Sequence, residues 1–250
     1  MIDILKNEIK IKNRRGCKYR CHIISGSYGF LFSLEKTMKK HENLFITIEG
    51  GEGSGKTTQS FLLKKYLEDS GYEVLLTREP GGTVLAENIR DILLSPNLNL
   101  IALSELFLLE AARAQHIKNL ILPALKKGKI VICDRFIDST VAYQGYGRKL
   151  DLQLINSLNL VASFGLIPIL TIYIDVIPSK GLEIAKKNNS KVYNACGDRI
   201  ESESMQFHND VRKGYIEQAR KYPKRIKVIK SQVTLDRTHA LIKNIVGAVL

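Results

Sequence analysis

The sequence predicts an α/β fold in which helices cover both faces of a parallel β-sheet. Short apolar runs typical of buried strands recur from residue 44 onward, and they alternate with longer segments of helical periodicity. The runs at 130–133 and 169–176 are almost continuously apolar, as expected for strands that are covered on both faces. Repeated β-α units also favour right-handed crossovers, so the strands should run parallel.

Five strands and the helices between them can be placed in order. Strands are predicted at 45–48, 74–77, 130–133, 169–176 and 226–229. Helices are predicted from the end of the first turn to Gly71 and at about 85–93, 104–127, 151–163 and 235–249. A polar, glycine-containing stretch at 136–148 is assigned no helix. The segment 187–198 lacks apolar periodicity and is predicted to be a mobile loop between two helices.

The first predicted strand leads into a glycine-rich turn, and residues 44–58 read LFITIEGGEGSGKTT. This turn matches G-x-x-x-x-G-K-[ST], the phosphate-binding P-loop. Its glycines let successive backbone N–H groups converge on an anion, and the helix that follows adds the positive end of its dipole. Lys56 is expected to bind the β- and γ-phosphates, and the Thr57 hydroxyl to hold Mg²⁺. The residues predicted to bind ATP are Gly50, Gly51, Glu52, Gly53, Ser54, Gly55, Lys56, Thr57 and Thr58.

Length and composition limit the class of protein. A chain of 250 residues with 44% hydrophobic content can bury one substantial core. No apolar run reaches the roughly 18 residues that a membrane span requires, so we expect a soluble protein with no membrane partner. Four scattered cysteines suit a reducing cytoplasm better than a disulfide scaffold. Cys17, Cys21 and His22 could begin a zinc site, but no second ligand pair follows at finger spacing.

The formal net charge of +13 raises the question of a nucleic-acid partner. Much of the lysine is spread over predicted helix faces and ends, which indicates a solvated surface. No interleaving of aromatic and basic residues marks a groove for single-stranded nucleic acid. We therefore expect no nucleic-acid partner.

The first 37 residues do not follow the strand–helix pattern. They hold eight Lys or Arg against three Asp or Glu, and Met38 opens a segment that reads like an ordinary start. We divide the chain into a basic, disordered extension at 1–37 and one domain at 38–250, and interpret the extension as an upstream-extended start. An organelle transit peptide is the alternative, although Asp3 and Glu8 argue against it.

Two arginines directly follow predicted strands. Arg78 comes after the second strand and Arg135 after the third, at the sheet edge where ligands bind in such folds. A guanidinium forks well onto phosphate oxygens, so the pair predicts a second substrate that carries a phosphate. The alternative is two surface arginines that pair with Glu79 and Asp138.

Three further segments carry a family resemblance. TREPGGT (77–83), AARAQH (111–116) and DRFIDSTVAYQGYGR (134–148) closely resemble the bacterial thymidylate kinases, and their order relative to the P-loop agrees as well. The resemblance runs from about residue 43 to the end. It implies a P-loop NTPase three-layer sandwich with a five-stranded parallel sheet. It also implies a homodimer that uses ATP and Mg²⁺ to phosphorylate dTMP to dTDP in dTTP biosynthesis.

The resemblance assigns roles to residues of the phosphate-binding machinery. Arg78 and Arg135 would clamp the phosphate of dTMP and, with Lys56, make up the catalytic set. Asp134 would reach Mg²⁺ through water, beside Thr57. Because the acceptor is itself a phosphate, largely dianionic near pH 7, no general base is required.

The resemblance also implies contacts to the nucleoside. Arg113 would hydrogen-bond the thymine edge, with Ser139 and Gln144 nearby. Tyr143 would crowd the 2′ position of the sugar, and Glu52 would contact the 3′-hydroxyl.

The sequence departs from the family pattern at the thymine. An aromatic residue usually stands four positions before the arginine of AAR, and Leu109 stands there instead. Apolar contact would survive without the stacking contribution, which is of order 1 kcal/mol. Phe107 is the alternative cover for the base.

The P-loop contains no arginine, and in such members of the family a lid supplies the cation. We predict the lid at about 187–198, where it would exclude water. The candidate cations are Lys186, Lys187, Lys191 and Arg199.

Two other functions stay open from the sequence. Within the enzymes, the chain could phosphorylate another nucleoside monophosphate or a deoxynucleoside. From a different class, it could be a non-catalytic, ATP-dependent module that binds nucleic acid.

Overall fold

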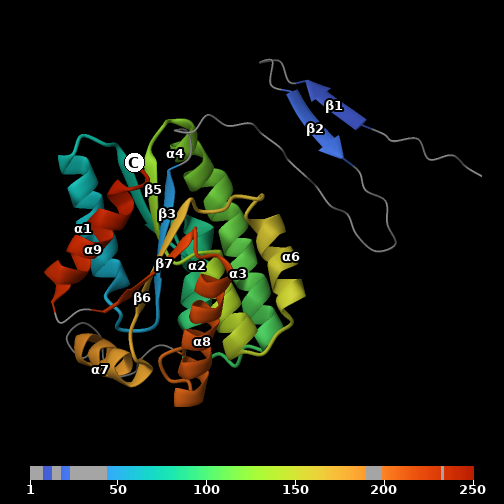
Figure 1. Ribbon diagram of the computed structural model, residues 1–250. Helices are drawn as coiled ribbons and strands as arrows, with labels where there is room; N and C mark the ends of the chain where they lie inside the picture. Colours follow the sequence, from blue (N-terminus) through green and yellow to red (C-terminus); the bar gives the residue numbers. More distant parts are fainter. Residues whose placement is uncertain (1–7, 13–17, 23–43, 190–198, 232–233) are drawn as a thin grey trace, which may run out of the picture. The chain divides into compact units, whose positions relative to one another are not determined.

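The computed structural model describes residues 8–12, 18–22, 44–189, 199–231 and 234–250 (Figure 1). The chain divides into two units, Met1–His41 and Glu42–Leu250. The sequence placed this division at 37/38.

The second unit is built on one five-stranded sheet. Its strands are β3 (Phe45–Gly50), β4 (Val74–Arg78), β5 (Ile130–Asp134), β6 (Leu170–Asp175) and β7 (Ile226–Lys230). Their order is β4-β5-β3-β6-β7, and every neighbouring pair is parallel. The predicted fold class is therefore confirmed, with the P-loop strand β3 at the centre of the sheet.

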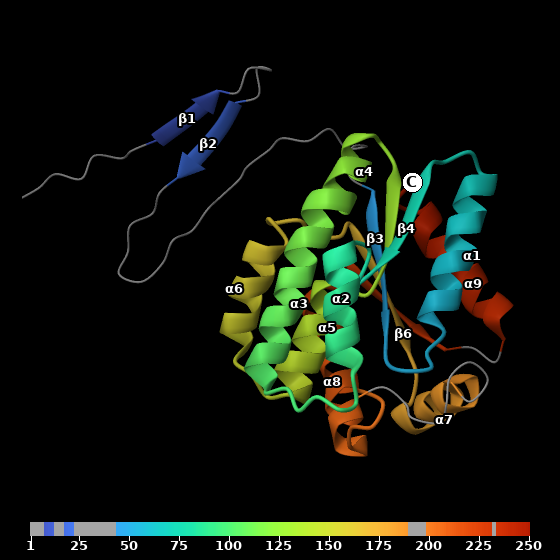
Figure 2. The same ribbon diagram turned by 180° about the vertical axis from the view of Figure 1, so that it is seen from behind.

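Helices cover both faces of this sheet. The helices are α1 (Lys56–Asp69), α2 (Val84–Leu94), α3 (Ala102–His116), α4 (Leu122–Lys126), α5 (Ile137–Thr140), α6 (Leu152–Ala162), α7 (Pro178–Asn189), α8 (Met205–Lys221) and α9 (Leu235–Gly247). Figures 1 and 2 show α1 and α9 on one face and α2, α3, α6 and α8 on the other. None of the helices in the described part of the chain is long and apolar enough to cross a membrane.

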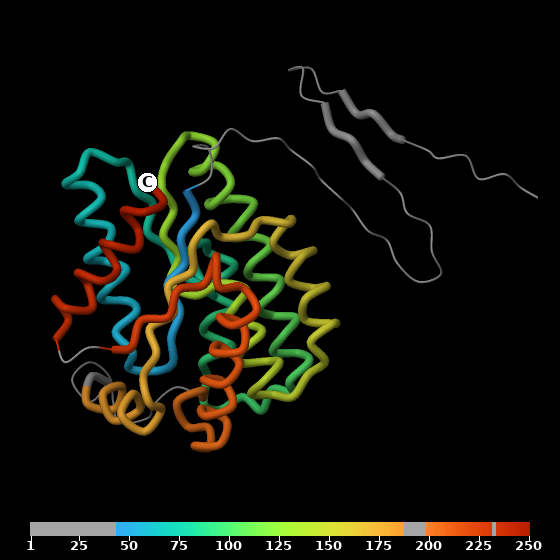
Figure 3. Tube along the Cα trace, in the orientation of Figure 1, coloured from blue at the N-terminus to red at the C-terminus, as the bar shows by residue number. Residues whose placement is uncertain are grey.

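The central strand β3 packs against both helical layers. Ile46 and Ile48 belong to the core under α1 and α9, whereas Phe45 belongs to the core on the opposite face, where it meets Phe136 edge-on at 4.9 Å. All six residues of β3 are buried. Burial on both sides explains why the strand reads as a nearly continuous apolar run. In the Cα trace of Figure 3, this strand leads through the P-loop into α1.

Two segments differ from the sequence prediction: one predicted helix is interrupted, and one stretch predicted without a helix is helical. The helix predicted at 104–127 is α3 followed by a π-helical turn, η1 (Ile117–Ile121), and then α4. The stretch at 136–148, assigned no helix, forms α5 and a second π-helical segment, η2 (Val141–Gly147). Its buried positions include polar residues such as Thr140 and Gln144, so the helical period is not visible as a hydrophobic pattern. Such π-helical turns are frequent at functional sites.

The predicted loop at 187–198 begins later than expected. Helix α7 continues to Asn189, and Lys187 in its last turn forms an ion pair with Glu183 one turn earlier, at 2.6 Å. Pairs at this spacing support a helix. Residues 190–198, which include Lys191, lie outside the described residues.

In the first unit, the structure describes two short strands, which lie within the segment 1–37 that the sequence predicted to be a disordered extension. Strands β1 (Glu8–Lys12) and β2 (Lys18–His22) pair antiparallel, with Ile9 opposite Cys21 and Ile11 opposite Tyr19. In both strands, apolar or aromatic residues alternate with charged ones along the sequence, which is a strand pattern. The prediction for this segment rested on its basic composition and did not take this alternation into account. The rest of the predicted extension lies outside the described residues.

Candidate active site

The P-loop connects β3 to α1 and has the backbone of an anion cradle. Gly53 and Gly55 have φ values of 62° and 83°, in the left-handed region that favours glycine. A Cβ on Gly53 would also collide with the backbone oxygen of Gly181 in α7, so no larger residue fits there. Gly55 caps α1 without a side-chain hydrogen bond. The first N–H groups of α1 are therefore available to a phosphate.

The residues beside the loop fit a Mg²⁺ ion. Thr57 Oγ1 donates to Asp134 Oδ2 at 2.5 Å, so a hydroxyl and a carboxylate already lie together. Asp134 Oδ1 is buried and has no hydrogen-bond partner among the described residues. Mg²⁺ prefers oxygen ligands and is usually held by one or two protein groups, with water and phosphate completing the shell. Lys56 lies nearby, its Nζ 3.4 Å from the carbonyl oxygen of Gly51.

A cleft of about 990 Å³ opens from the P-loop along the carboxyl ends of β4 and β5. It gathers most of the predicted site residues, although they come from six separate segments of the chain. The predicted residues that line it are Glu52, Lys56, Thr57, Arg78, Leu109, Arg113, Asp134, Arg135, Ser139, Tyr143, Gln144 and Arg199. The structure thus brings the triphosphate loop and the predicted acceptor residues to one space.

Arg135 joins the loop to the cleft. Its backbone φ is 70°, an uncommon value for a residue with a side chain. The guanidinium donates to the carbonyl oxygen of Gly50 at 3.0 Å and to Glu52 Oε1 at 2.6 Å, and it lies 4.9 Å from the centre of the Tyr143 ring. Strained backbone of this kind persists where the surroundings fix it and is typical of functional positions.

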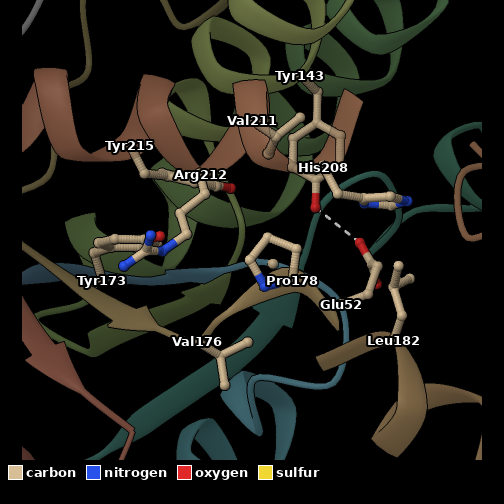
Figure 4. Close-up of a pocket in the computed structure, with 11 residues that line it drawn as sticks. Glu52, Tyr143, Tyr173, Val176, Pro178, Leu182, His208, Val211, Arg212 and Tyr215 are labelled. Atoms are coloured by element: carbon tan, nitrogen blue, oxygen red, sulfur yellow. Dashed lines mark hydrogen bonds between the residues drawn. The ribbon is translucent and has the colours of Figure 1, made fainter. Parts of the chain in front are cut away.

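Glu52 lies where P-loop and cleft meet. Figure 4 shows the hydrogen bond from the Tyr143 hydroxyl to Glu52, which is 2.8 Å long. Burial acts to raise the pKa of Glu52, but the charges of Arg135 and Lys56 and the Tyr143 hydrogen bond outweigh it and lower the pKa to about 2. Glu52 is therefore ionised at neutral pH. The small cavity drawn in Figure 4, about 20 Å³, has room for about one water molecule.

Glu49 lies behind the cleft and contacts two of the residues that line it, and it was not predicted from the sequence. It is fully buried at the end of β3 and accepts hydrogen bonds from Phe136 N at 2.8 Å, Ser139 Oγ at 2.6 Å and the Tyr215 hydroxyl at 2.9 Å. Burial, followed by the charge of Asp138, raises its pKa to about 7. The sequence did contain an indication of this role, because a glutamate in a buried strand needs hydrogen-bond donors or positive charges around it.

Arg113 is buried and held by four side chains. Its Nε donates to Glu79 at 2.8 Å, Nη1 to Glu110 at 2.9 Å and to Asn159 at 2.7 Å, and Nη2 to Thr140 at 2.8 Å. Burial acts to lower the pKa of Arg113, but the charges of Glu79 and Glu110 offset it and raise the pKa. The guanidinium on the cleft wall is therefore a fixed donor.

The surface pairs considered from the sequence do not form. Arg78 pairs with Glu87 at 2.9 Å, while Glu79 belongs to Arg113. Asp138 pairs with Arg225 at 2.6 Å, and Arg135 contacts Gly50 and Glu52 of the P-loop instead. Arg78 remains half exposed at the rim of the cleft, where it can reach a ligand.

Leu109 and Phe107 are the two residues that the sequence offers as cover for the base. The two residues lie on different sides of α3, and the cleft is lined by Leu109. Phe107 is 52% exposed and is not among the residues that line the cleft.

The structure adds Arg90 to the cleft. This residue of α2 lines the same space as Arg78 and Arg135. Burial lowers the pKa of Arg90, and so do the charges of those two arginines. Arg90 lies four residues after Ala86 and three before Leu93, both buried, so the helical period already placed it on the inner side of α2.

Of the predicted lid cations, Arg199 is held on the cleft wall. Its Nη2 pairs with Glu105 at 2.5 Å and its Nε donates to the carbonyl oxygen of Leu93 at 3.0 Å. Lys186 and Lys187 are exposed on α7 and are not among the residues that line the cleft.

A triphosphate loop that opens onto a second, arginine-lined cleft is the arrangement of a kinase whose acceptor carries a phosphate. Comparison with known proteins shows to which family of kinases the chain belongs. A family model described as thymidylate kinase matches residues 48–242. The chain therefore belongs to the thymidylate kinase family, whose reaction is the phosphorylation of dTMP to dTDP.

Curated relatives and a solved structure agree. The thymidylate kinase of Syntrophotalea carbinolica is 49% identical over 195 residues, which cover 78% of this chain and 90% of that protein. The thymidylate kinase of Clostridium novyi is 43% identical over 81% of this chain and 98% of that protein. The crystal structure of thymidylate kinase from Ehrlichia chaffeensis is similar with a TM-score of 0.67 at 39% identity, and covers 82% of this chain and 98% of that one.

Proposed function

We propose that the P-loop binds ATP with Mg²⁺, that the adjoining cleft binds dTMP, and that the γ-phosphate passes to the phosphate of dTMP to supply dTTP biosynthesis. The observation that carries this is the position of Arg135. Its guanidinium contacts the Gly50 carbonyl of the P-loop and also lines the cleft. Arg135 would therefore hold the acceptor phosphate directly beside the donor loop.

On the donor side, the backbone of residues 50–58 and the first turn of α1 would hold the phosphates of ATP. Lys56 would bind the β- and γ-phosphates as a point charge. Thr57 and Asp134 would hold Mg²⁺, the latter through water. When bound, the ion would neutralise charge on the phosphate oxygens.

On the acceptor side, Arg78 and Arg135 would clamp the phosphate of dTMP, and Arg90 is placed to add a third positive charge. The acceptor oxygen needs no base because the phosphate is largely dianionic near pH 7. The chain's contribution is alignment of the two phosphates and neutralisation of their repulsion.

The nucleoside would lie farther along the cleft. We place the thymine against Leu109, with Arg113, Ser139 and Gln144 at its polar edge. The sugar would lie beside Tyr143 and Glu52, which are already hydrogen-bonded to each other at 2.8 Å. That bond fixes the tyrosine ring where a 2′-hydroxyl would need space.

For the lid, we propose that a lysine supplies the cation at the transferring phosphate. Arg199 is occupied by Glu105 and by the carbonyl oxygen of Leu93. The remaining candidates are Lys186, Lys187 and Lys191, the last of which lies outside the described residues.

A panel of acceptors tests the proposal. Purified protein is supplied with MgATP and, in turn, dTMP, dCMP, dGMP, dAMP and thymidine, and diphosphate or monophosphate formation is measured. We expect turnover with dTMP well above the others. Equal turnover of several monophosphates, or of thymidine, would support another nucleotide or nucleoside kinase. DNA binding that weakens with salt, without phosphoryl transfer, would support the non-catalytic module.

We also propose a homodimer formed through α3 and α6. Leu103 and Phe107 on α3 and Leu160 and Val161 on α6 are exposed, and the two helices are neighbours in Figures 1 and 2. A second copy of the chain would cover this apolar face, as the resemblance implies. Sedimentation should give twice the mass of one chain, and Phe107→Glu should give one chain mass; a wild-type monomer would contradict the proposal.

We further propose that the enzyme works in the cytoplasm without a nucleic-acid partner. The buried free thiol of Cys133 suits a reducing compartment. Fractionation of cells that make the protein would test the location.

A further inference from the structure

Glu105 is a buried carboxylate on the cleft wall that the proposed mechanism does not use. It lies on α3 and is 1% exposed. Glu105, Leu109 and Arg113 are spaced four residues apart, so they lie on one face of α3, and all three line the cleft. Glu105 is therefore beside the place proposed for the base.

The charge of Glu105 is fixed by two arginines. Arg148 donates to its two oxygens at 3.2 and 3.3 Å, and Arg199 donates at 2.5 Å. Burial acts to raise the pKa of Glu105, but the hydrogen bond from Gln144 and the arginine charges outweigh it, and the pKa is lowered. An ionised carboxylate only accepts hydrogen bonds.

This charge dictates which way the amide of Gln144 points. Gln144 Nε2 donates to Glu105 Oε1 at 2.7 Å. A carboxylate with no proton can bond the NH₂ end of an amide but not its oxygen, so the opposite orientation is excluded by chemistry. Gln144 Oε1 accepts no hydrogen bond from the described residues, and Gln144 lines the cleft. Gln144 Oε1 is therefore left to accept a hydrogen bond from a ligand in the cleft.

We propose that Glu105 is a positioning residue that sets base specificity by holding the Gln144 amide with its oxygen toward the acceptor base. This rests on the proposed function. Thymine presents a carbonyl oxygen at C4 and an N–H at N3, which match the donor Arg113 and the acceptor Gln144. Cytosine presents an NH₂ group at C4 and a bare nitrogen at N3, so donor faces donor and acceptor faces acceptor.

The test compares dTMP with 5-methyl-dCMP, which differ only at this edge. The readout is the ratio of kcat/KM for dTMP to kcat/KM for 5-methyl-dCMP, which does not depend on the fraction of folded enzyme. Sites that hydrogen-bond a substrate group reject its mismatched analogue by up to about 10⁴-fold. A wild-type enzyme with a large ratio is the starting requirement.

Glu105→Gln is the main variant. A neutral amide at position 105 can donate, so the amide of Gln144 can turn and offer its NH₂ to cytosine. We expect the ratio to fall at least about tenfold, the equivalent of one hydrogen bond of about 1.4 kcal/mol. Arg148→Gln is the matched control: it removes an ion pair of Glu105 but keeps the bond to Gln144, so the ratio should stay within about twofold.

A double-mutant cycle separates positioning from general damage. In a Gln144→Leu background, Glu105→Gln should change the ratio by less than about twofold, because the amide through which Glu105 acts is absent. If Glu105→Gln does not fold, Glu105→Gln with Arg148→Gln is compared with Arg148→Gln alone, since one of the two orphaned arginines is then removed.

Two results would overturn this proposal alone. One is an unchanged ratio in Glu105→Gln, and the other is an equal fall with and without Gln144. Both concern variants of an enzyme that prefers dTMP, so they leave the proposed function standing. A wild-type enzyme that does not distinguish the two substrates would overturn the thymidylate assignment and this proposal together.

Discussion

The P-loop end of the cleft, to which we assign the phosphates, depends largely on backbone. The end lined by Arg113 and Glu105, to which we assign the base, depends on buried charged side chains. We call these ends the phosphate side and the base side. The P-loop depends on the left-handed conformations of Gly53 and Gly55 and on the N–H groups that begin α1. On the base side, Arg113 and Glu105 are each held by partners from other segments of the chain. The phosphate side would accept any phosphate, because backbone N–H groups respond to negative charge. The base side would distinguish bases, because each of its side chains offers a donor or an acceptor in a fixed direction.

The largest expected effect is at Arg135, where the two sides meet. Arg135→Ala should lower kcat/KM for dTMP about 10³-fold, since arginines on transferring phosphates contribute on this scale. ATP turnover against dTMP is measured in a coupled assay. Arg220→Ala, which removes an exposed arginine paired with Glu217 on α8, is the control and should keep wild-type turnover. A fall of less than about tenfold would remove Arg135 from the catalytic set.

Removing a carboxylate from the buried charge network around Arg113 should lower the free energy of unfolding. Glu79→Gln removes one carboxylate from buried Arg113, and such losses cost about 3 kcal/mol or more. Glu87→Gln removes the exposed partner of Arg78 and should cost less than about 1 kcal/mol. Urea unfolding gives both free energies. Equal costs would contradict the view that the base side depends on buried charge.

The contributions of Glu49 and Glu52 to the free energy of unfolding should change with pH in opposite directions. The pKa of Glu49 is raised from 4.5 to about 7, so the folded chain holds this proton more tightly than the unfolded chain. Stability from Glu49 is therefore present at low pH and is lost, by about 3 kcal/mol, as pH rises from 4.5 through 7. The pKa of Glu52 is lowered to about 2, so its contribution is present above 4.5 and is lost as pH falls toward 2.

Unfolding free energies of wild type, Glu49→Gln and Glu52→Gln between pH 3 and 8 check this contrast. The advantage of wild type over Glu49→Gln should shrink as pH rises from 4.5 to 7. The advantage over Glu52→Gln should shrink only below pH 4.5. Parallel curves for wild type and Glu49→Gln would show that Glu49 does not titrate in this range.

The smallest expected effect is an improvement, namely a lower KM for dTMP. Leu109→Phe places a ring on the cleft wall, and stacking on the base should lower KM for dTMP about fivefold, the equivalent of about 1 kcal/mol. Phe107→Leu is the counterpart on the outer side of α3 and should leave KM unchanged. A KM that responds to Phe107 and not to Leu109 would reverse the assignment.

The same contrast explains what could be predicted from the sequence. The P-loop is contiguous, so its glycines, Lys56 and Thr57 are visible as a pattern, and the strand before it is a clear apolar run. The five parallel strands were predicted within a few residues, because each contains a short apolar run. The central strands β3, β5 and β6 are almost wholly buried, whereas the edge strands β4 and β7 are buried in part. Arg78 and Arg135 were placed in the cleft by their positions after strands.

The network around the base was not predictable in the same way. Arg113 reaches Glu79 and Asn159, which are 34 and 46 residues away, and no local pattern encodes such pairings. Glu49 was hidden in a strand that reads as apolar. The π-helical segment η2 was missed because its buried residues show no helical period. They are consecutive in the sequence and mix small, aromatic and polar side chains: Ala142, Tyr143, Gln144 and Gly145.

The central claim is that Arg135 belongs to the acceptor and Lys56 to the donor, within one cleft. Isothermal titration of Arg135→Ala and Lys56→Ala tests it, with dTMP and with a non-hydrolysable ATP analogue plus Mg²⁺ as ligands. We predict that Arg135→Ala loses affinity for dTMP and keeps that for the ATP analogue, while Lys56→Ala does the reverse. A comparable loss of affinity for both ligands in Arg135→Ala would contradict the assignment of Arg135 to the acceptor and Lys56 to the donor.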